Sequence, residues 1–87
     1  MTDLISKHHA LTAMSEGSIV RGEEIDPDAE PKSEVAPHQR MQFRMTLDKR
    51  FWFKAPGLGS RWKEPAALYF FNQFKTFSIV GLRKEAA

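Results

Sequence analysis

The sequence predicts an α+β fold, in which a β-hairpin and a C-terminal strand form a small antiparallel or mixed sheet packed by one aromatic-rich helix. Three observations lead to this prediction. Apolar and polar residues alternate over residues 41–54, aromatic residues recur at helical spacing over 64–75, and β-branched residues are concentrated over 76–82. A chain of 87 residues is long enough for one domain of this kind.

The N-terminal part, residues 1–20, is expected to form a short helix followed by a possible edge strand. Thr2 or Asp3 is a suitable N-cap, the helix is predicted to end near Ser15, and Gly17 is the expected stop signal. Its apolar stripe is narrow, so we expect this helix either to dock on the later core or to fray. Residues 18–20, SIV, are the candidate for the edge strand.

Residues 21–37 are predicted to form an acidic, proline-rich linker or loop. Their sequence, RGEEIDPDAEPKSEVAP, contains three prolines and six acidic residues and offers little to bury. Every aromatic residue of the chain follows this segment, the first being Phe43. The core domain is therefore assigned to residues 38–87.

The segment from residue 41 to 54 has the alternation of a strand whose two faces differ. The apolar side chains at odd positions are Met41, Phe43, Met45, Leu47, Phe51 and Phe53. The opposite face, at even positions, carries Gln42, Arg44, Thr46, Trp52 and Lys54. One face is expected to pack on the core, and the other combines cations with a tryptophan.

The turn after Leu47 decides on which side Trp52 lies. A three-residue turn pairs Leu47 with Phe51 and keeps Trp52 with the cations, and this is the hairpin that we favour. It requires a positive φ at Lys49 or Arg50, because this turn contains no glycine. A two-residue turn would put Trp52 in the core, whereas one long bent strand would keep the favoured parity.

The remaining elements follow from local signals. Residues 55–60, APGLGS, are expected to form a surface loop. A helix is predicted from about Glu64 to about Lys75, because an acid and a proline suit its first turn. Residues 76–82, TFSIVGL, are predicted to form a closing strand, buried on both sides if it is central, and a basic tail follows.

The charge of the chain is divided between its two parts. Residues 1–37 contain three Lys and Arg against eight Asp and Glu, a net charge of −5, whereas the remainder contains ten against three, a net charge of +7. Separation of this kind bears on solubility and partners rather than on the fold.

Several functional classes find no support in the sequence. The chain lacks cysteine, His8 and His9 are adjacent, and His38 follows the acidic segment without other ligands. No metal site is therefore predicted. The glycines at 57 and 59 fit neither a P-loop nor a dinucleotide fingerprint. With no nucleophile motif either, we expect a protein that is not an enzyme and uses no cofactor.

No stretch matches a signal peptide or a membrane span. We therefore expect a soluble, cytoplasmic protein without membrane partners, and leave its oligomeric state open.

The polar face around Trp52 is the predicted binding site. An aromatic ring beside cations is typical of proteins that bind single-stranded or structured RNA or DNA, in which bases stack and phosphates pair with Lys and Arg. The predicted site residues are Arg44, Trp52, Lys54, Lys49, Arg50, Arg40, Arg61 and Lys63. The alternative is a protein-interaction module, such as a regulator, inhibitor or assembly subunit, whose basic face docks on an acidic protein.

Overall fold

The computed structural model describes residues 3–29, 40–57, 59 and 61–83. Within these residues the chain forms a five-stranded sheet of order β1-β5-β2-β3-β4, in which all paired strands are antiparallel, together with two helices. The elements are β1 (Ile5–Ser6), α1 (Lys7–Ser15), β2 (Ser18–Ile25), β3 (Gln42–Met45), β4 (Phe51–Lys54), α2 (Ala67–Asn72) and β5 (Phe74–Leu82). The fold is therefore α+β, as predicted.

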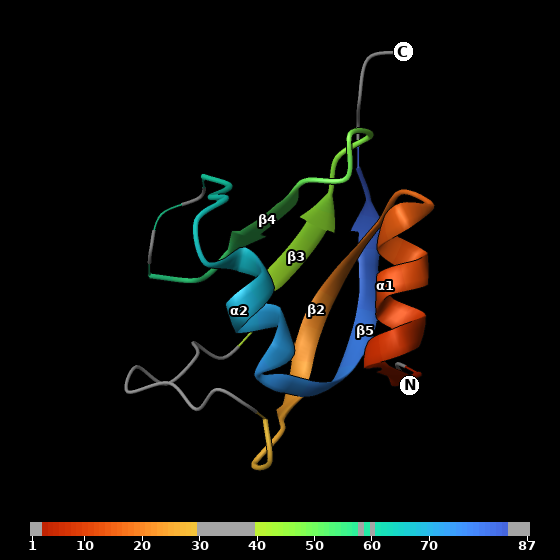
Figure 1. Cartoon of the computed structure of the whole chain (residues 1–87), viewed down its shortest axis with the longest axis vertical. Helices are drawn as coiled ribbons and strands as arrows, with labels where there is room; N and C mark the ends of the chain where they lie inside the picture. The colour runs from red at the N-terminus through yellow and green to blue at the C-terminus, as the bar shows by residue number, and fades with distance from the viewer. Residues whose placement is uncertain (1–2, 30–39, 58, 60, 84–87) are drawn as a thin grey trace.

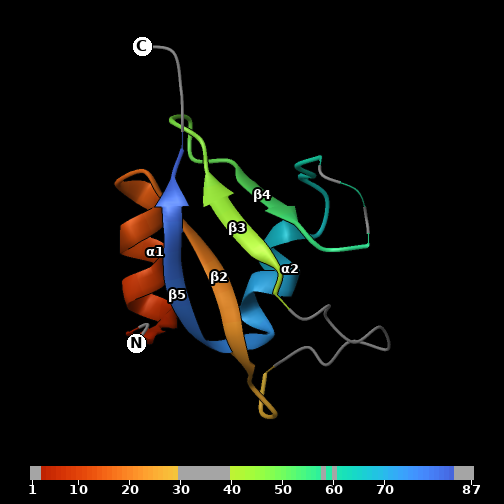
Figure 2. The same ribbon diagram turned by 180° about the vertical axis from the view of Figure 1, so that it is seen from behind.

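Both helices lie on the same side of the sheet, α1 beside β5 and α2 across β3 and β2 (Figure 1). The opposite side of the sheet carries no helix of the described part of the chain, and the strands β2, β3 and β4 are seen there directly (Figure 2). We call this side the open face. Because side chains alternate along each strand, the same three strands supply both the core and the open face.

The core lies between the helices and the sheet and is built from phenylalanine rings. Phe43 of β3 lies edge-on to Phe71 of α2, with 5.5 Å between the ring centroids. Phe71 stacks on Phe77 of β5 at 4.5 Å. These rings are fully buried, as is Met14 of α1, which joins the same cluster. Offset and edge-to-face contacts of this kind add to the free energy of burial.

Helix α1 starts later than predicted. Its N-cap is Ser6, whose hydroxyl accepts a hydrogen bond from the His9 amide at 3.2 Å, and the helix ends at Ser15 as expected. The predicted cap at Thr2 or Asp3 is wrong because residues 5 and 6 form β1 and pair with β5. The backbone groups of residues 5 and 6 pair with β5, so they are not available for an earlier helical turn.

Strand β2 corrects two predictions. The residues expected to form a short edge strand begin an eight-residue strand that lies between β5 and β3. Residues 21–25, assigned to the acidic linker, continue this strand, and residues 30–37 lie outside the described part. A Cβ atom added at Gly22 would come within 2.5 Å of the Phe74 ring. The absence of a side chain at Gly22 thus lets the Phe74 ring lie directly against the strand.

The hairpin has the predicted parity but a different register. Met45 pairs with Phe51, so the loop runs from residue 46 to residue 50. Leu47 lies in this loop with 66% of its surface exposed, and its predicted pairing with Phe51 is wrong. Lys49 has a φ of 66°, the positive value that the missing glycine required. Thr46 closes the loop, because its hydroxyl accepts from the Arg50 amide at 3.2 Å.

The C-terminal elements also differ in their bounds. Helix α2 covers residues 67–72 rather than 64–75, because Ala66, at its N-cap, has a φ of 65° and is not helical. Strand β5 starts at Phe74 and occupies a central position. It is not buried on both sides, since Ile79 and Leu82 remain 50% and 71% exposed.

Candidate functional site

The open face of β3 and β4 carries the side chains that the sequence predicted to lie together. Arg44 of β3 is directly opposite Trp52 of β4, and Gln42 is directly opposite Lys54. Directly paired residues in an antiparallel ladder point to the same side of the sheet. The alternative with a two-residue turn, which would have paired Trp52 with Met45, does not occur.

A second tryptophan joins this face from the segment after β4. Phe53 and Lys63 form an isolated antiparallel bridge, in which the Phe53 amide donates to the Lys63 carbonyl at 2.7 Å and the reverse bond is 2.8 Å. Trp62, one residue before this bridge, therefore lies on the side of the sheet opposite to that of Phe53. Its ring is covered by cations, with Lys54 Nζ at 4.9 Å from the ring centroid.

Trp62 is a site residue that the sequence analysis missed. The predicted helix starts only at about Glu64, and nothing in the local pattern of residues 61–63 indicates that they pair with β4. The signal that could have revealed it is that Trp62 lies between Arg61 and Lys63, two residues already predicted to belong to the site.

The two tryptophans border a common concavity of about 390 Å³, which we call the aromatic hollow. It is lined by Trp52, Arg61, Trp62, Lys63, Glu64 and Pro65. Both tryptophans are partly exposed, whereas Arg61 and Lys63 are exposed. Three of the predicted site residues, Trp52, Arg61 and Lys63, thus meet in one place.

The arginine at the end of the hairpin loop is held over the first tryptophan. Arg50 forms a two-point ion pair with Glu64, in which Nε and Oε1 are 3.1 Å apart. Its guanidinium carbon lies 5.8 Å from the Trp52 ring centroid. The charge of Arg50 is therefore partly compensated. Lys49 is exposed in the same loop, and no described contact brings it to the tryptophans.

Two donors on this face are buried without a hydrogen-bond partner in the described part of the chain. They are Arg44 Nε and Trp52 Nε1. A buried donor without an acceptor costs free energy, so these two groups are a local source of instability beneath the open face.

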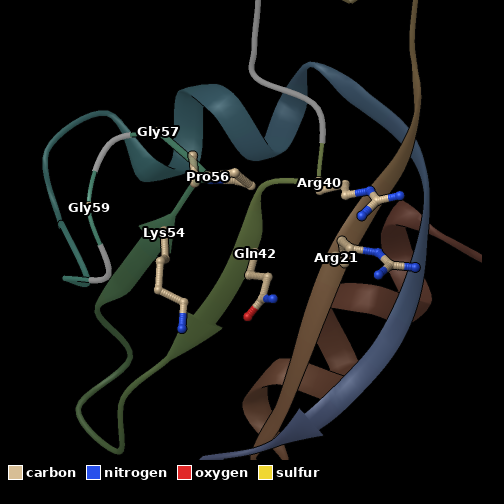
Figure 3. A pocket seen from close by; sticks show the side chains of 8 residues that line it. Arg21, Arg40, Gln42, Lys54, Pro56, Gly57 and Gly59 are labelled. Carbon is tan, nitrogen blue, oxygen red and sulfur yellow. The ribbon is translucent and has the colours of Figure 1, made fainter.

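A second concavity, of about 430 Å³, lies at the end of β4, and we call it the end pocket (Figure 3). It is lined by Arg21, Arg40, Gln42, Lys54, Ala55, Pro56, Gly57 and Gly59. In Figure 3, Arg21 and Arg40 extend alongside each other over β2, while Lys54 and Gln42 project from the neighbouring strands. Arg40, predicted as an outlying member of the site, thus belongs to this pocket.

Glu23 supplies a carboxylate that pairs with Arg21 and feels the charge of Arg40. Arg21 Nε is 2.8 Å from Glu23 Oε2, and the Ser78 hydroxyl donates to the same oxygen. Burial acts to raise the pKa of Glu23, but the hydrogen bonds from Ser78 and Arg21 and the charges of Arg21 and Arg40 together hold that pKa below its ordinary value. Glu23 is therefore negatively charged at neutral pH.

Within residues 3–29, 40–57, 59 and 61–83, no group of three or more His, Cys, Asp or Glu could hold a metal ion. Neither helix of the described chain has the length and apolar character needed to cross a membrane. No protein-family model matches the chain, and no significant match was found among curated proteins or among solved structures.

Proposed function

We propose that this protein binds single-stranded or locally unpaired nucleic acid on its open face. The observation that carries the proposal is the pair of tryptophans, Trp52 and Trp62, that border one hollow on a side of the sheet with no described helix. Exposed aromatic side chains on a sheet are used by several nucleic-acid-binding folds as platforms on which bases stack. No catalytic group is required for this activity.

We expect the phosphates of a bound strand to contact the cations around the tryptophans. Arg44 and Lys54 lie against the Trp62 ring, and Arg61 and Lys63 are among the residues that line the aromatic hollow. Arg and Lys that neutralise phosphates release counterions, so their contribution to binding depends strongly on salt. The arrangement thus combines base stacking with contacts to the nucleic-acid backbone, and neither interaction requires a particular base sequence.

Unpaired bases are favoured over a duplex as the ligand. In a duplex the bases stack on one another and present only their edges, whereas a single strand can turn a base face onto a tryptophan. Among the described residues, the open face also presents no helix that could enter a major groove. We therefore expect a single strand to bind more tightly than a duplex of the same length.

The proposal is tested by titrating the protein with a mixed-sequence single-stranded oligonucleotide and with the corresponding duplex at two salt concentrations. Trp52 and Trp62 are the two tryptophans of the chain, so fluorescence excited selectively at tryptophan reports on this face. We expect quenching by the single strand that weakens steeply with salt. If neither oligonucleotide binds at low salt, the proposal is wrong, and an acidic protein surface becomes the partner to test.

A further inference from the structure

We infer that the end pocket receives the terminal phosphate of the bound strand, so that the protein recognises a strand end that carries a phosphomonoester. This inference rests on the proposed function and adds to it a site for the terminal phosphate of the strand. Lys54 links the two sites, because it lines the end pocket while its Nζ lies 4.9 Å from the Trp62 ring centroid. A strand whose bases stack at the tryptophans can therefore place its end in this pocket.

The charge of the pocket matches a phosphomonoester better than an internal phosphate. Three cations, Arg21, Arg40 and Lys54, line it, and the carboxylate of Glu23 pairs with the first of them. Three positive charges and one negative charge leave a net charge of +2. A phosphomonoester carries about −1.5 to −2 at neutral pH, whereas each phosphate within a strand carries a single negative charge.

Arg40, which lines the pocket, has an uncommon backbone conformation. Its φ is 61°, which is disfavoured for a residue with a side chain. The adjacent Met41 is fixed in the core, and its carbonyl accepts a hydrogen bond from the Gly22 amide at 2.9 Å. The backbone at Arg40 is thus constrained, while its long and exposed side chain remains able to turn its guanidinium onto an anion.

The size and the wall of the pocket fit a nucleotide end rather than a bare ion. A volume of about 430 Å³ falls in the range typical of small-molecule sites. One wall contains Gly57 and Gly59, and a Cβ atom at either position would meet nothing within 4 Å. A wall of this kind lets a sugar and its phosphate approach the backbone closely.

The test compares three oligonucleotides of one sequence that carry a 5′-phosphate, a 3′-phosphate or no terminal phosphate. The full chain is titrated with each at fixed ionic strength, with Trp fluorescence as the readout. We expect one of the two phosphorylated forms to bind about tenfold more tightly than the unphosphorylated form, since charge-assisted hydrogen bonds to phosphate are among the stronger contacts.

The variant Arg40→Gln should abolish this preference, so that the three oligonucleotides bind with nearly equal affinity. Arg61→Gln is the matched control, because it removes one charge at the aromatic hollow and should weaken all three complexes by a similar factor. Circular dichroism and a thermal melt establish that both variants are folded. A preference that survives Arg40→Gln in a folded protein would overturn the assignment.

Two outcomes separate this inference from the proposed function. Equal affinity for the three oligonucleotides would overturn the terminal-phosphate site and leave the proposed function standing. Failure of every oligonucleotide to bind would overturn both, and a parallel titration with inorganic phosphate and with a nucleoside monophosphate would show whether the pocket takes a small phosphate instead of a strand end.

Discussion

The guanidinium carbon of Arg44 lies 4.7 Å from the centroid of the Trp62 ring, although the two residues belong to segments separated by β4. Arg44 is also paired with Trp52 across the β3–β4 ladder. One side chain thus lies next to both tryptophans of the open face. Cation–π contacts of this kind are worth roughly 0.5–1 kcal/mol at exposed sites, which is enough to orient a ring but not to determine the fold.

Replacing a tryptophan should affect binding more than folding. We expect Trp62→Ala and Trp52→Ala each to weaken the single-strand complex by about 1–3 kcal/mol, the usual contribution of a stacked base. Tyr69→Ala is the control, because Tyr69 lies on α2, on the other side of the sheet, and should leave binding unchanged. Affinities measured by fluorescence anisotropy with a labelled strand would check this. Unchanged affinity in both tryptophan variants would argue against stacking.

Removal of a cation should appear in the salt dependence of binding. Lys54→Gln is expected to reduce the slope of log K against log salt by about 1, because one phosphate contact is lost. Lys75→Gln removes the same charge from a residue that lines neither the aromatic hollow nor the end pocket, and should leave the slope nearly unchanged. Titrations at four or more salt concentrations give both slopes. Equal slopes for the wild type and Lys54→Gln would remove Lys54 from the interface.

Gly22→Ala should destabilise the protein. The new methyl group would lie 2.5 Å from the Phe74 ring, so the ring or the strand must move. Overpacking of this kind typically costs about 1–3 kcal/mol. Gly81→Ala is the control, since the nearest atom to its Cβ position is Ile19 Cδ1 at 4.0 Å. Urea unfolding followed by circular dichroism would measure both, and equal midpoints for the two variants would contradict the predicted clash.

Stability should fall in acid partly through Glu23. Because the pKa of Glu23 is lowered in the folded protein from an ordinary value of 4.5, the unfolded chain binds this proton more readily. The contribution to stability is therefore present above the ordinary pKa and is lost as the pH falls through the lower, folded value.

The variant Glu23→Gln lacks this titration. We expect the difference in unfolding free energy between the wild type and Glu23→Gln to favour the wild type more at pH 7 than at pH 3. Urea unfolding at several pH values provides the measurement. A difference that does not change with pH would show that the Arg21 and Ser78 contacts do not stabilise the charged form.

The features that could be predicted from the sequence are those set by local periodicity. The alternation over residues 41–54 correctly placed Arg44, Trp52 and Lys54 on one side of the sheet, because an odd number of loop residues preserves the parity of the hairpin. The positive φ at Lys49 was predictable for a similar reason, since a tight loop without glycine must place another residue in that region.

The features that could not be predicted depend on contacts between distant segments. Strand β2 continues through Glu23 and Glu24 because β5 supplies the partner for its backbone, and the acidic composition alone indicated a loop. Trp62 reaches the open face through a bridge to Phe53, which no local pattern reveals. Most of the candidate site was thus visible in one hairpin, whereas the second tryptophan and Arg21 required the topology.

The five-residue loop between β3 and β4 has a consequence for how the chain can vary. Insertion or deletion of one residue there would exchange the sides of every residue in β4, sending Trp52 into the core and Phe53 to the surface. A change of two residues would preserve both sides. Changes in loop length that preserve the fold should therefore add or remove an even number of residues. A change by an odd number should disrupt core packing and ligand recognition together.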